Sequence, residues 1–135
     1  MADPVVGILV GSESDREAME AATKELDARG ISWEFNVLSA HRNPREVADY
    51  STNAQSRGIR VLITGAGLAA ALPGVVAAHT ELPVIGVPLR SSKSVLDGLD
   101  ALLAIVQMPP GVPVACVGVD NSKNAAVLAA RILAV

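Results

Sequence analysis

The feature that most constrains the fold is a regular alternation between short apolar runs and longer segments with helical patterning. The short runs are rich in Val and Ile and lie at residues 5–10, 31–37, 61–64, 84–87 and 112–119. Such runs, each followed by enough residues to form a helix, are typical of parallel strands that are buried on both faces. We therefore expect an α/β fold with a parallel sheet of about five strands.

The composition is that of one domain with an aliphatic core. The chain has 135 residues, of which 50% are hydrophobic and only 2% aromatic, and we predict a single domain over residues 1–135. The net charge is -3 and no two Lys or Arg residues are adjacent, which argues against nucleic acid and anionic membranes as partners. No apolar stretch reaches the roughly 18 residues that cross a bilayer, and no basic leader is present, so we expect a soluble cytoplasmic protein.

Two of the predicted helices begin at capping signals. A capping box that starts at Ser14 predicts a helix over residues 14–29. Asn43 is followed by Pro44, which is the preferred order of an N-cap and a first helical residue. This signal predicts a second helix that ends near Gly58.

Three further segments show helical patterning. Residues 68–78 are apolar nearly all the way round, which would leave a hydrophobic face in water on a surface helix. We therefore expect this segment to be buried in a homo-oligomer. A fourth amphipathic stripe comprises Leu96, Leu99, Leu102 and Leu103. A fifth covers residues 125–133, with Asn121 or Ser122 near its N-cap.

Most of the chemically versatile side chains directly follow the predicted strands. The loops concerned are residues 11–15, 39–42, 65–67, 90–93 and 120–122. In an open parallel sheet, ligands bind beyond the carboxyl ends of the strands. We therefore place the functional site at this edge of the sheet.

The loop at residues 11–15 is suited to binding an anion. Ser12 and Ser14 offer hydroxyl groups, and the free N–H groups of a helix start favour negative charge. The same residues also fit an ordinary helix cap, in which Ser14 accepts from the backbone and Asp15 complements the helix dipole. The loop alone does not choose between the two interpretations.

Gly65, Gly67 and Ala70 match the G-x-G-x-x-A pattern of dinucleotide-binding turns. That pattern requires an acidic residue about 20 positions later to bind a ribose. Residues 84–88 contain none, which argues against a nicotinamide or flavin cofactor. We therefore interpret the glycines as positions of close backbone approach to a ligand or of close helix packing.

His41 is the best candidate for a catalytic residue. It follows a predicted strand and neighbours the permanent charge of Arg42, and imidazole is the commonest general acid or base in enzymes; a loop His is otherwise often only a surface residue. His79 ends an apolar helix, where we expect it to bond terminal carbonyls. Two His residues without a third clustered ligand give no support for a metal site. We interpret Cys116 as an inert core thiol.

Six short strings together resemble one known family. They are Gly11-Ser-Glu-Ser-Asp15, Ser39-Ala-His-Arg42, Gly65-Ala-Gly67, Leu72-Pro-Gly74, Val84-Ile-Gly-Val-Pro88 and Gln107-Met-Pro109. In order and spacing they resemble the N-carboxyaminoimidazole ribonucleotide mutases of purine biosynthesis, also known as the catalytic subunits of phosphoribosylaminoimidazole carboxylase. The resemblance covers essentially the whole chain.

The resemblance implies a flavodoxin-like, three-layer α/β/α fold that commonly assembles as an octamer. It also implies transfer of a carboxylate from the exocyclic nitrogen of an aminoimidazole ribonucleotide to a ring carbon, through released carbon dioxide and without a metal or organic cofactor. His41 matches the histidine that takes the ring proton, and Ser12, Asp15 and Arg42 match positions that hold the phosphoribosyl portion. We also count Ser14, Ser39, Gly65 and Gly67 among the substrate-binding residues.

Two departures from the family pattern bear on activity. Ala71 stands where the bacterial mutases usually carry a second His, and the sequence ends at Val135, where family members usually continue into another helix. One alternative is therefore an oligomeric scaffold of the same fold, engineered or catalytically impaired. Another is a nicotinate-nucleotide carboxylase, a related group that also shows Ala before Leu-Pro, although the strings at residues 39–42 and 107–109 favour the purine mutases.

Overall fold

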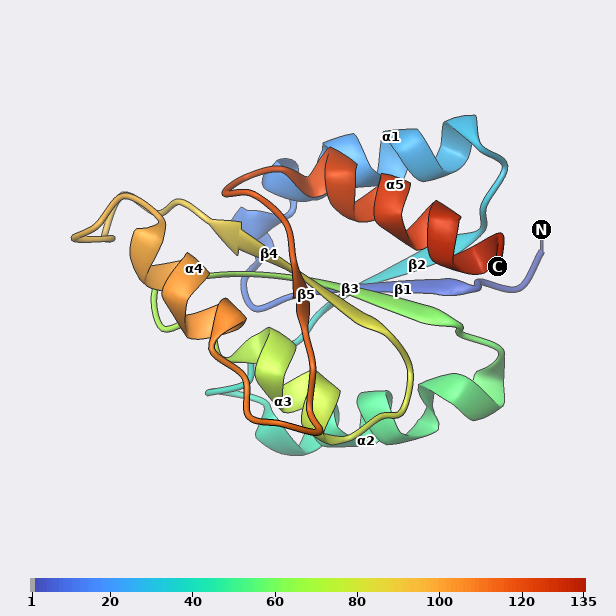
Figure 1. The fold of residues 1–135 in the computed structure, drawn as a ribbon, viewed down its shortest axis with the longest axis horizontal. Coiled ribbons are helices and arrows are strands. Elements are labelled where there is room, and N and C mark those ends of the chain that lie inside the picture. Colours follow the sequence, from blue (N-terminus) through green and yellow to red (C-terminus); the bar gives the residue numbers. More distant parts are fainter. Residues whose placement is uncertain (1) are drawn as a thin grey trace.

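The computed structural model describes residues 2–135, which form a parallel β-sheet between two layers of helices (Figure 1). The strands are β1 (Val6–Val10), β2 (Trp33–Val37), β3 (Val61–Gly67), β4 (Val84–Leu89) and β5 (Ala115–Cys116). Their order in the sheet is β2-β1-β3-β4-β5, and every neighbouring pair is parallel. This is the flavodoxin-like strand order, so the predicted fold class is confirmed.

The helices cover both faces of the sheet. They are α1 (Glu20–Ala28), α2 (Pro44–Ala54), α3 (Leu72–Ala78), α4 (Leu99–Val106) and α5 (Ser122–Leu133). α1 and α5 pack side by side on one face, and α2, α3 and α4 lie on the other, which gives the three expected layers (Figure 1). No helix within residues 2–135 has the length and apolarity to cross a membrane.

Alternate residues of the central strands point into two separate cores. Val6, Ile8 and Val10 of β1 pack with α1 and α5, whereas Leu9 packs with the helices of the opposite face. All four side chains are fully buried. A strand covered on both faces needs an apolar residue at every position, which is why β1 appears in the sequence as a continuous apolar run.

The first helix begins later than predicted, and Ser14 is not its cap. Ser12 has an extended backbone, and its Oγ accepts a hydrogen bond from the N–H of Ser14 at the start of a 3-10 turn over Glu13–Asp15. A second 3-10 turn at Glu17–Met19 precedes α1, which starts at Glu20. The prediction of a capping box at Ser14 is wrong, because Ser14 lies inside the 3-10 turn and Ser12, with its extended backbone, occupies the cap position.

The helix predicted over residues 68–78 begins only at Leu72. β3 runs on beyond its predicted end, and Leu68 and Ala70 then adopt positive φ angles of 57° and 42°. This left-handed conformation cannot continue a helix of L-residues. Leu72, Pro73 and Val76 of α3 are buried within the monomer, so the sheet covers much of this segment without a partner chain, and its burial in an oligomer stays a prediction.

The second and fifth helices form where their capping signals lie. α2 starts at Pro44 and ends through a 3-10 turn at Gly58, whose φ is 101°. α5 starts at Ser122, and the Oδ1 atom of Asn121 accepts from the N–H of Asn124 at 3.1 Å. Both helix starts are confirmed, although Asn43 makes no side-chain cap bond to α2.

The predicted strand over residues 112–119 pairs only at Ala115–Cys116. Pro113 lies just before the paired residues and has no N–H group to donate to a ladder. The sheet therefore ends in a short edge strand beside β4.

Candidate active site

A cavity of about 430 Å³ opens at the carboxyl edge of the sheet. Its walls come from the loops that follow β1, β2, β3 and β4, within residues 11–15, 39–42, 66–72 and 91–93. β2 and β3 lie on opposite sides of β1, which makes this edge the topological switch point where such folds bind ligands. The volume lies in the range of small-molecule sites.

Ser12, Ser14 and Asp15 reach the cavity from the loop after β1. The Oγ atoms of Ser12 and Ser14 lie 2.9 Å apart, within hydrogen-bonding distance. Ser12 is therefore a structural cap that also presents its oxygen at the cavity wall. Burial raises the pKa of the Asp15 carboxyl above its usual value, because low-dielectric surroundings disfavour the charged form.

The loop after β2 is braced by its own side chains. The Oγ atom of Ser39 accepts from the N–H of Arg42 at 3.2 Å, and the Oδ1 atom of Asn43 accepts from the N–H of Ser39 at 3.2 Å. Asn43 thus stabilises this loop and makes no side-chain cap bond to α2. The turn places His41 and Arg42 on the cavity wall, where both are exposed.

Gly65 and Gly67 have different roles. Gly67 lines the cavity, and a Cβ atom built on it would lie 3.1 Å from the carbonyl oxygen of Leu89, so a larger residue would push the end of β4 away. Gly65 does not line the cavity, and a Cβ atom built on it would lie 2.8 Å from the Sδ atom of Met19. The structure thus shows close packing at Gly65, and its role in substrate binding stays a prediction.

Ala71 also lines the cavity, at the position where the family resemblance expects a second His. Its methyl group can neither donate nor accept a hydrogen bond. His41 is therefore the only imidazole among the described residues of the wall.

Lys93 is a cavity residue that the sequence motifs do not indicate. It lines the wall with Ser91 and Ser92, from the loop after β4. Arg90, the other cation of this loop, instead pairs with Asp97 and Asp120 at 3.3 Å each. Its position in the strand-end loop at residues 90–93 was the available signal, but the sequence does not show which of the two cations of this loop an acid neutralises.

The loop at residues 120–122 does not contribute to the cavity. Asp120 accepts from the backbone and side chain of Arg90, and Asn121 caps α5. The hydroxyl of Ser122 donates to the carbonyl of Ala18 at 2.8 Å. These polar groups stabilise the fold, so the general expectation that strand-end loops carry function fails for the last loop.

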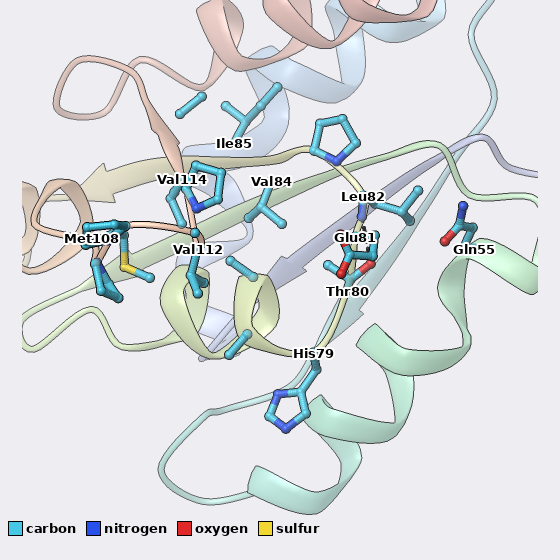
Figure 2. Close-up of a pocket in the computed structure, with 18 of the residues that line it drawn as sticks. Gln55, His79, Thr80, Glu81, Leu82, Val84, Ile85, Met108, Val112 and Val114 are labelled. Carbon is cyan, nitrogen blue, oxygen red and sulfur yellow. Dashed lines mark hydrogen bonds between the residues drawn. The ribbon is translucent and has the colours of Figure 1, made fainter.

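A second, larger hollow lies at the opposite, amino-terminal edge of the sheet (Figure 2). Its volume is about 1250 Å³, and most of its lining belongs to residues 77–85 and 106–115. His79 lies at its rim, and its Nδ1 atom donates to the carbonyl of Val75 at 2.9 Å. The predicted structural role of His79 at the end of α3 is confirmed.

The groups available for chemistry in the cavity are Asp15, His41, Arg42 and Lys93. Among residues 2–135, no three His, Cys, Asp or Glu side chains lie close enough together to hold a metal ion. Cys116 lies outside the cavity, and burial raises the pKa of its thiol, which lowers the fraction of reactive thiolate.

Comparison with models of known protein families matches residues 5–135 to the family described as AIR carboxylase. The match spans nearly the whole chain. This chain belongs to the AIR carboxylase family. The family that the six sequence strings resemble is thereby confirmed.

Curated relatives and solved structures agree with membership of the AIR carboxylase family. The chain is 53% identical over 132 residues to the N5-carboxyaminoimidazole ribonucleotide mutase of Pyrococcus horikoshii. The alignment covers 98% of this chain and 73% of that protein. It is 54% identical to the protein of the same name from Thermotoga maritima, in an alignment that covers 98% of this chain and 76% of that protein. It is 56% identical over 131 residues to the phosphoribosylaminoimidazole carboxylase of Schizosaccharomyces pombe, in an alignment that covers 97% of this chain and 23% of that protein. The structure of Treponema denticola PurE matches with a TM-score of 0.85 at 33% identity, over 97% of this chain and 80% of that chain.

Proposed function

We propose that this chain is an N5-carboxyaminoimidazole ribonucleotide mutase, which isomerises N5-carboxyaminoimidazole ribonucleotide to carboxyaminoimidazole ribonucleotide in purine biosynthesis. The observation that carries the proposal is one cavity that brings the imidazole of His41 and the guanidinium of Arg42 together with a loop of hydroxyls and a carboxyl group. Relatives named as this mutase support it, and they favour it over a nicotinate-nucleotide carboxylase.

The phosphoribosyl portion of the substrate fits the loops after β1 and β2. The guanidinium of Arg42 offers a planar fork for phosphate oxygens. The hydroxyls of Ser12 and Ser14 can donate to the same group, and the carboxylate of Asp15 can accept from ribose hydroxyls. This arrangement leaves the imidazole ring of the substrate within the reach of His41.

The proposed chemistry balances with a single proton carrier. The bond between the exocyclic nitrogen and the carboxylate breaks and releases carbon dioxide, and that nitrogen takes up a proton from the imidazolium form of His41. The ring carbon, which the amino group makes nucleophilic, then attacks carbon dioxide and loses its proton to His41. Because the reaction is an isomerisation, the proton that His41 takes from the ring carbon replaces the one that the nitrogen received, and no net proton is gained or lost. The cavity keeps carbon dioxide beside the ring, so proximity replaces a bimolecular encounter.

The proposal is tested by an ultraviolet assay of the purified protein in the decarboxylation direction, starting from carboxyaminoimidazole ribonucleotide. We expect turnover by the parent and its loss in the His41→Asn variant. Affinity for the nucleotide should stay within about tenfold in that variant, because a base acts mainly in the transition state. Equal activity of His41→Asn would remove this residue from the mechanism.

The Ala71→His variant addresses the missing second imidazole. An active parent shows that one imidazole on the cavity wall is sufficient. An inactive parent together with an active Ala71→His variant would instead identify a fold that binds nucleotide with its chemistry switched off. That outcome would favour the scaffold alternative over the mutase.

We further propose a closed homo-oligomer, most simply the octamer that the family resemblance implies. The support is an exposed apolar surface, here called the α4 face, which comprises Val95, Leu96, Leu99, Leu103 and Val106. These side chains are between 44% and 89% exposed in the monomer, and a contiguous apolar face of this kind is typical of a protein interface. We also propose a cytoplasmic location, because the proposed substrate is a water-soluble phosphorylated metabolite.

A further inference from the structure

Two cationic side chains line the cavity, and they follow two strands that are not neighbours in the sheet. Arg42 follows β2 and Lys93 follows β4, and β1 and β3 lie between these strands in the sheet. At about 4.8 Å for each step between neighbouring strands, β2 and β4 are roughly 14 Å apart. The two side chains therefore enter the cavity from different sides. The arrangement suits a ligand that carries a negative group at each of its two ends.

The protein itself neutralises neither cation. Within residues 2–135, the salt bridges involve Arg16, Arg29, Arg57 and Arg90, and none includes Arg42 or Lys93. Asp15 is the only carboxyl group on the described part of the cavity wall, and it lies in the loop after β1. The end of the cavity near β4 therefore has a positive charge without a protein counter-charge, which attracts an anion.

The backbone holds Lys93 close to the end of β3. The N–H of Lys93 donates to the Oγ atom of Ser91 at 3.2 Å. Ser91 in turn packs on Gly67, because a Cβ atom built on Gly67 would lie 3.8 Å from the Cβ atom of Ser91. The wall that follows β3 is apolar and comprises residues 66–68 and 70–72. Lys93 is thus the only charged side chain on the β3 and β4 side of the cavity among the described residues.

We propose that Lys93 binds the carboxylate that the enzyme transfers, and that it thereby distinguishes carboxylated from uncarboxylated nucleotide. The inference rests on the proposed function, in which the loops after β1 and β2 hold the phosphoribosyl portion. The imidazole ring and its carboxylate then extend toward the loops after β3 and β4, where Lys93 supplies the counter-charge. An ammonium group forms a charge-assisted hydrogen bond with a carboxylate.

Isothermal titration of two nucleotides tests this role. Carboxyaminoimidazole ribonucleotide carries the carboxylate, and aminoimidazole ribonucleotide has the same phosphoribosyl portion without it. We expect Lys93→Ala to weaken binding of the carboxylated nucleotide by about tenfold or more, the usual effect of losing a hydrogen bond to a charged group. Binding of the uncarboxylated nucleotide should change by less than about threefold, and Lys93→Arg should restore most of the difference.

A matched control removes the same charge elsewhere. Lys24 is exposed on α1 and does not line the cavity, so Lys24→Ala should leave both affinities unchanged. An equal loss for both nucleotides in Lys93→Ala would mean that Lys93 acts on the phosphate or through the general field, and no loss would mean that it contacts neither; either result overturns the inference. A parent that binds neither nucleotide would refute the proposed function itself, which is a separate outcome.

Discussion

Asp15 is a residue at which binding and stability oppose each other. Burial raises the pKa of its carboxyl, so the folded state holds the proton more tightly than the unfolded state does. The stabilising contribution of the protonated form is complete below the unfolded pKa and is lost as the pH rises through the folded pKa. At neutral pH the ionised carboxylate therefore costs stability, and its position on the cavity wall gives a functional reason to keep it.

We predict that Asp15→Asn stabilises the protein at pH 7 and weakens nucleotide binding. The gain in the free energy of unfolding should be less than about 1 kcal/mol, because solvent screens this partly exposed group. It should disappear as the pH falls below about 4, where the parent carboxyl is protonated in both states. Urea denaturation at the two pH values and titration with aminoimidazole ribonucleotide measure the two effects. A gain that persists at low pH, or unchanged affinity, would contradict this account.

Ser12 and Lys93 show why single residues limit prediction from sequence. Ser12 and Ser14 are chemically identical, and only the extended backbone of Ser12 makes it the cap. Lys93 and Arg90 are both cations of one loop, and only the fold brings Asp97 and Asp120 to Arg90. Residue type and local spacing were sufficient to find the loops, whereas the partner of each side chain depends on tertiary contacts.

At the scale of elements, two asparagines before helices have the same local sequence role and different structural roles. Asn121 accepts from the N–H of Asn124 and caps α5. Asn43 makes no side-chain cap bond to α2 and accepts from the N–H of Ser39 in the cavity loop. The same residue type at the same kind of position therefore serves stability in one helix and site geometry in the other.

We predict that the two alanine variants separate these roles. Asn121→Ala should lower the free energy of unfolding by about 1 kcal/mol, the usual cost of losing a cap, with no effect on nucleotide affinity. Asn43→Ala should lower stability by less and weaken binding by a few fold, because the loop of His41 and Arg42 loses a brace. Urea denaturation and calorimetric titration of both variants provide the measurement. The reverse pattern would show that Asn43 acts as an ordinary cap.

Sequence patterns predicted helix starts and strands well where these depend on neighbouring residues in the chain, such as a helix cap or a continuous apolar run. The start of α2 at Pro44 and the positions of the four long strands follow from capping and from continuous apolar runs. The helix over residues 68–78 was overestimated because Leu68 and Ala70 adopt positive φ angles that their residue types do not favour. The fifth strand was overestimated because pairing at a sheet edge depends on the neighbouring strand, and Pro113 limits it.

At the scale of the whole molecule, the apolar surface that remains exposed is on α4 and not on α3. Sequence patterning identified both segments as apolar, but it could not decide which of them the sheet covers. α3 buries Leu72 and Val76, whereas Leu99 and Leu103 of α4 stay exposed. The expectation of an oligomer thus remains a proposal that now rests on a different helix.

We predict that the parent is an octamer in solution and that Leu99→Glu with Leu103→Glu dissociates it. Two carboxylates on the α4 face would have to be buried without partners in any interface formed there. Light scattering at micromolar concentration measures the assembly, and circular dichroism checks that the variant is folded. Val135→Glu is the control, because it changes an exposed apolar residue outside the α4 face. A monomeric parent would contradict the prediction.

The cavity takes its walls from four loops, each attached to a different strand, so a ligand bound there would connect four parts of the sheet. A ligand that contacts all four loops binds only when the four strands are in place, so it stabilises the native state by mass action. At a concentration one hundred times Kd the gain is about 2.7 kcal/mol. If the proposed nucleotide binds there, we expect abundant nucleotide to protect the chain from proteolysis and its depletion to speed degradation.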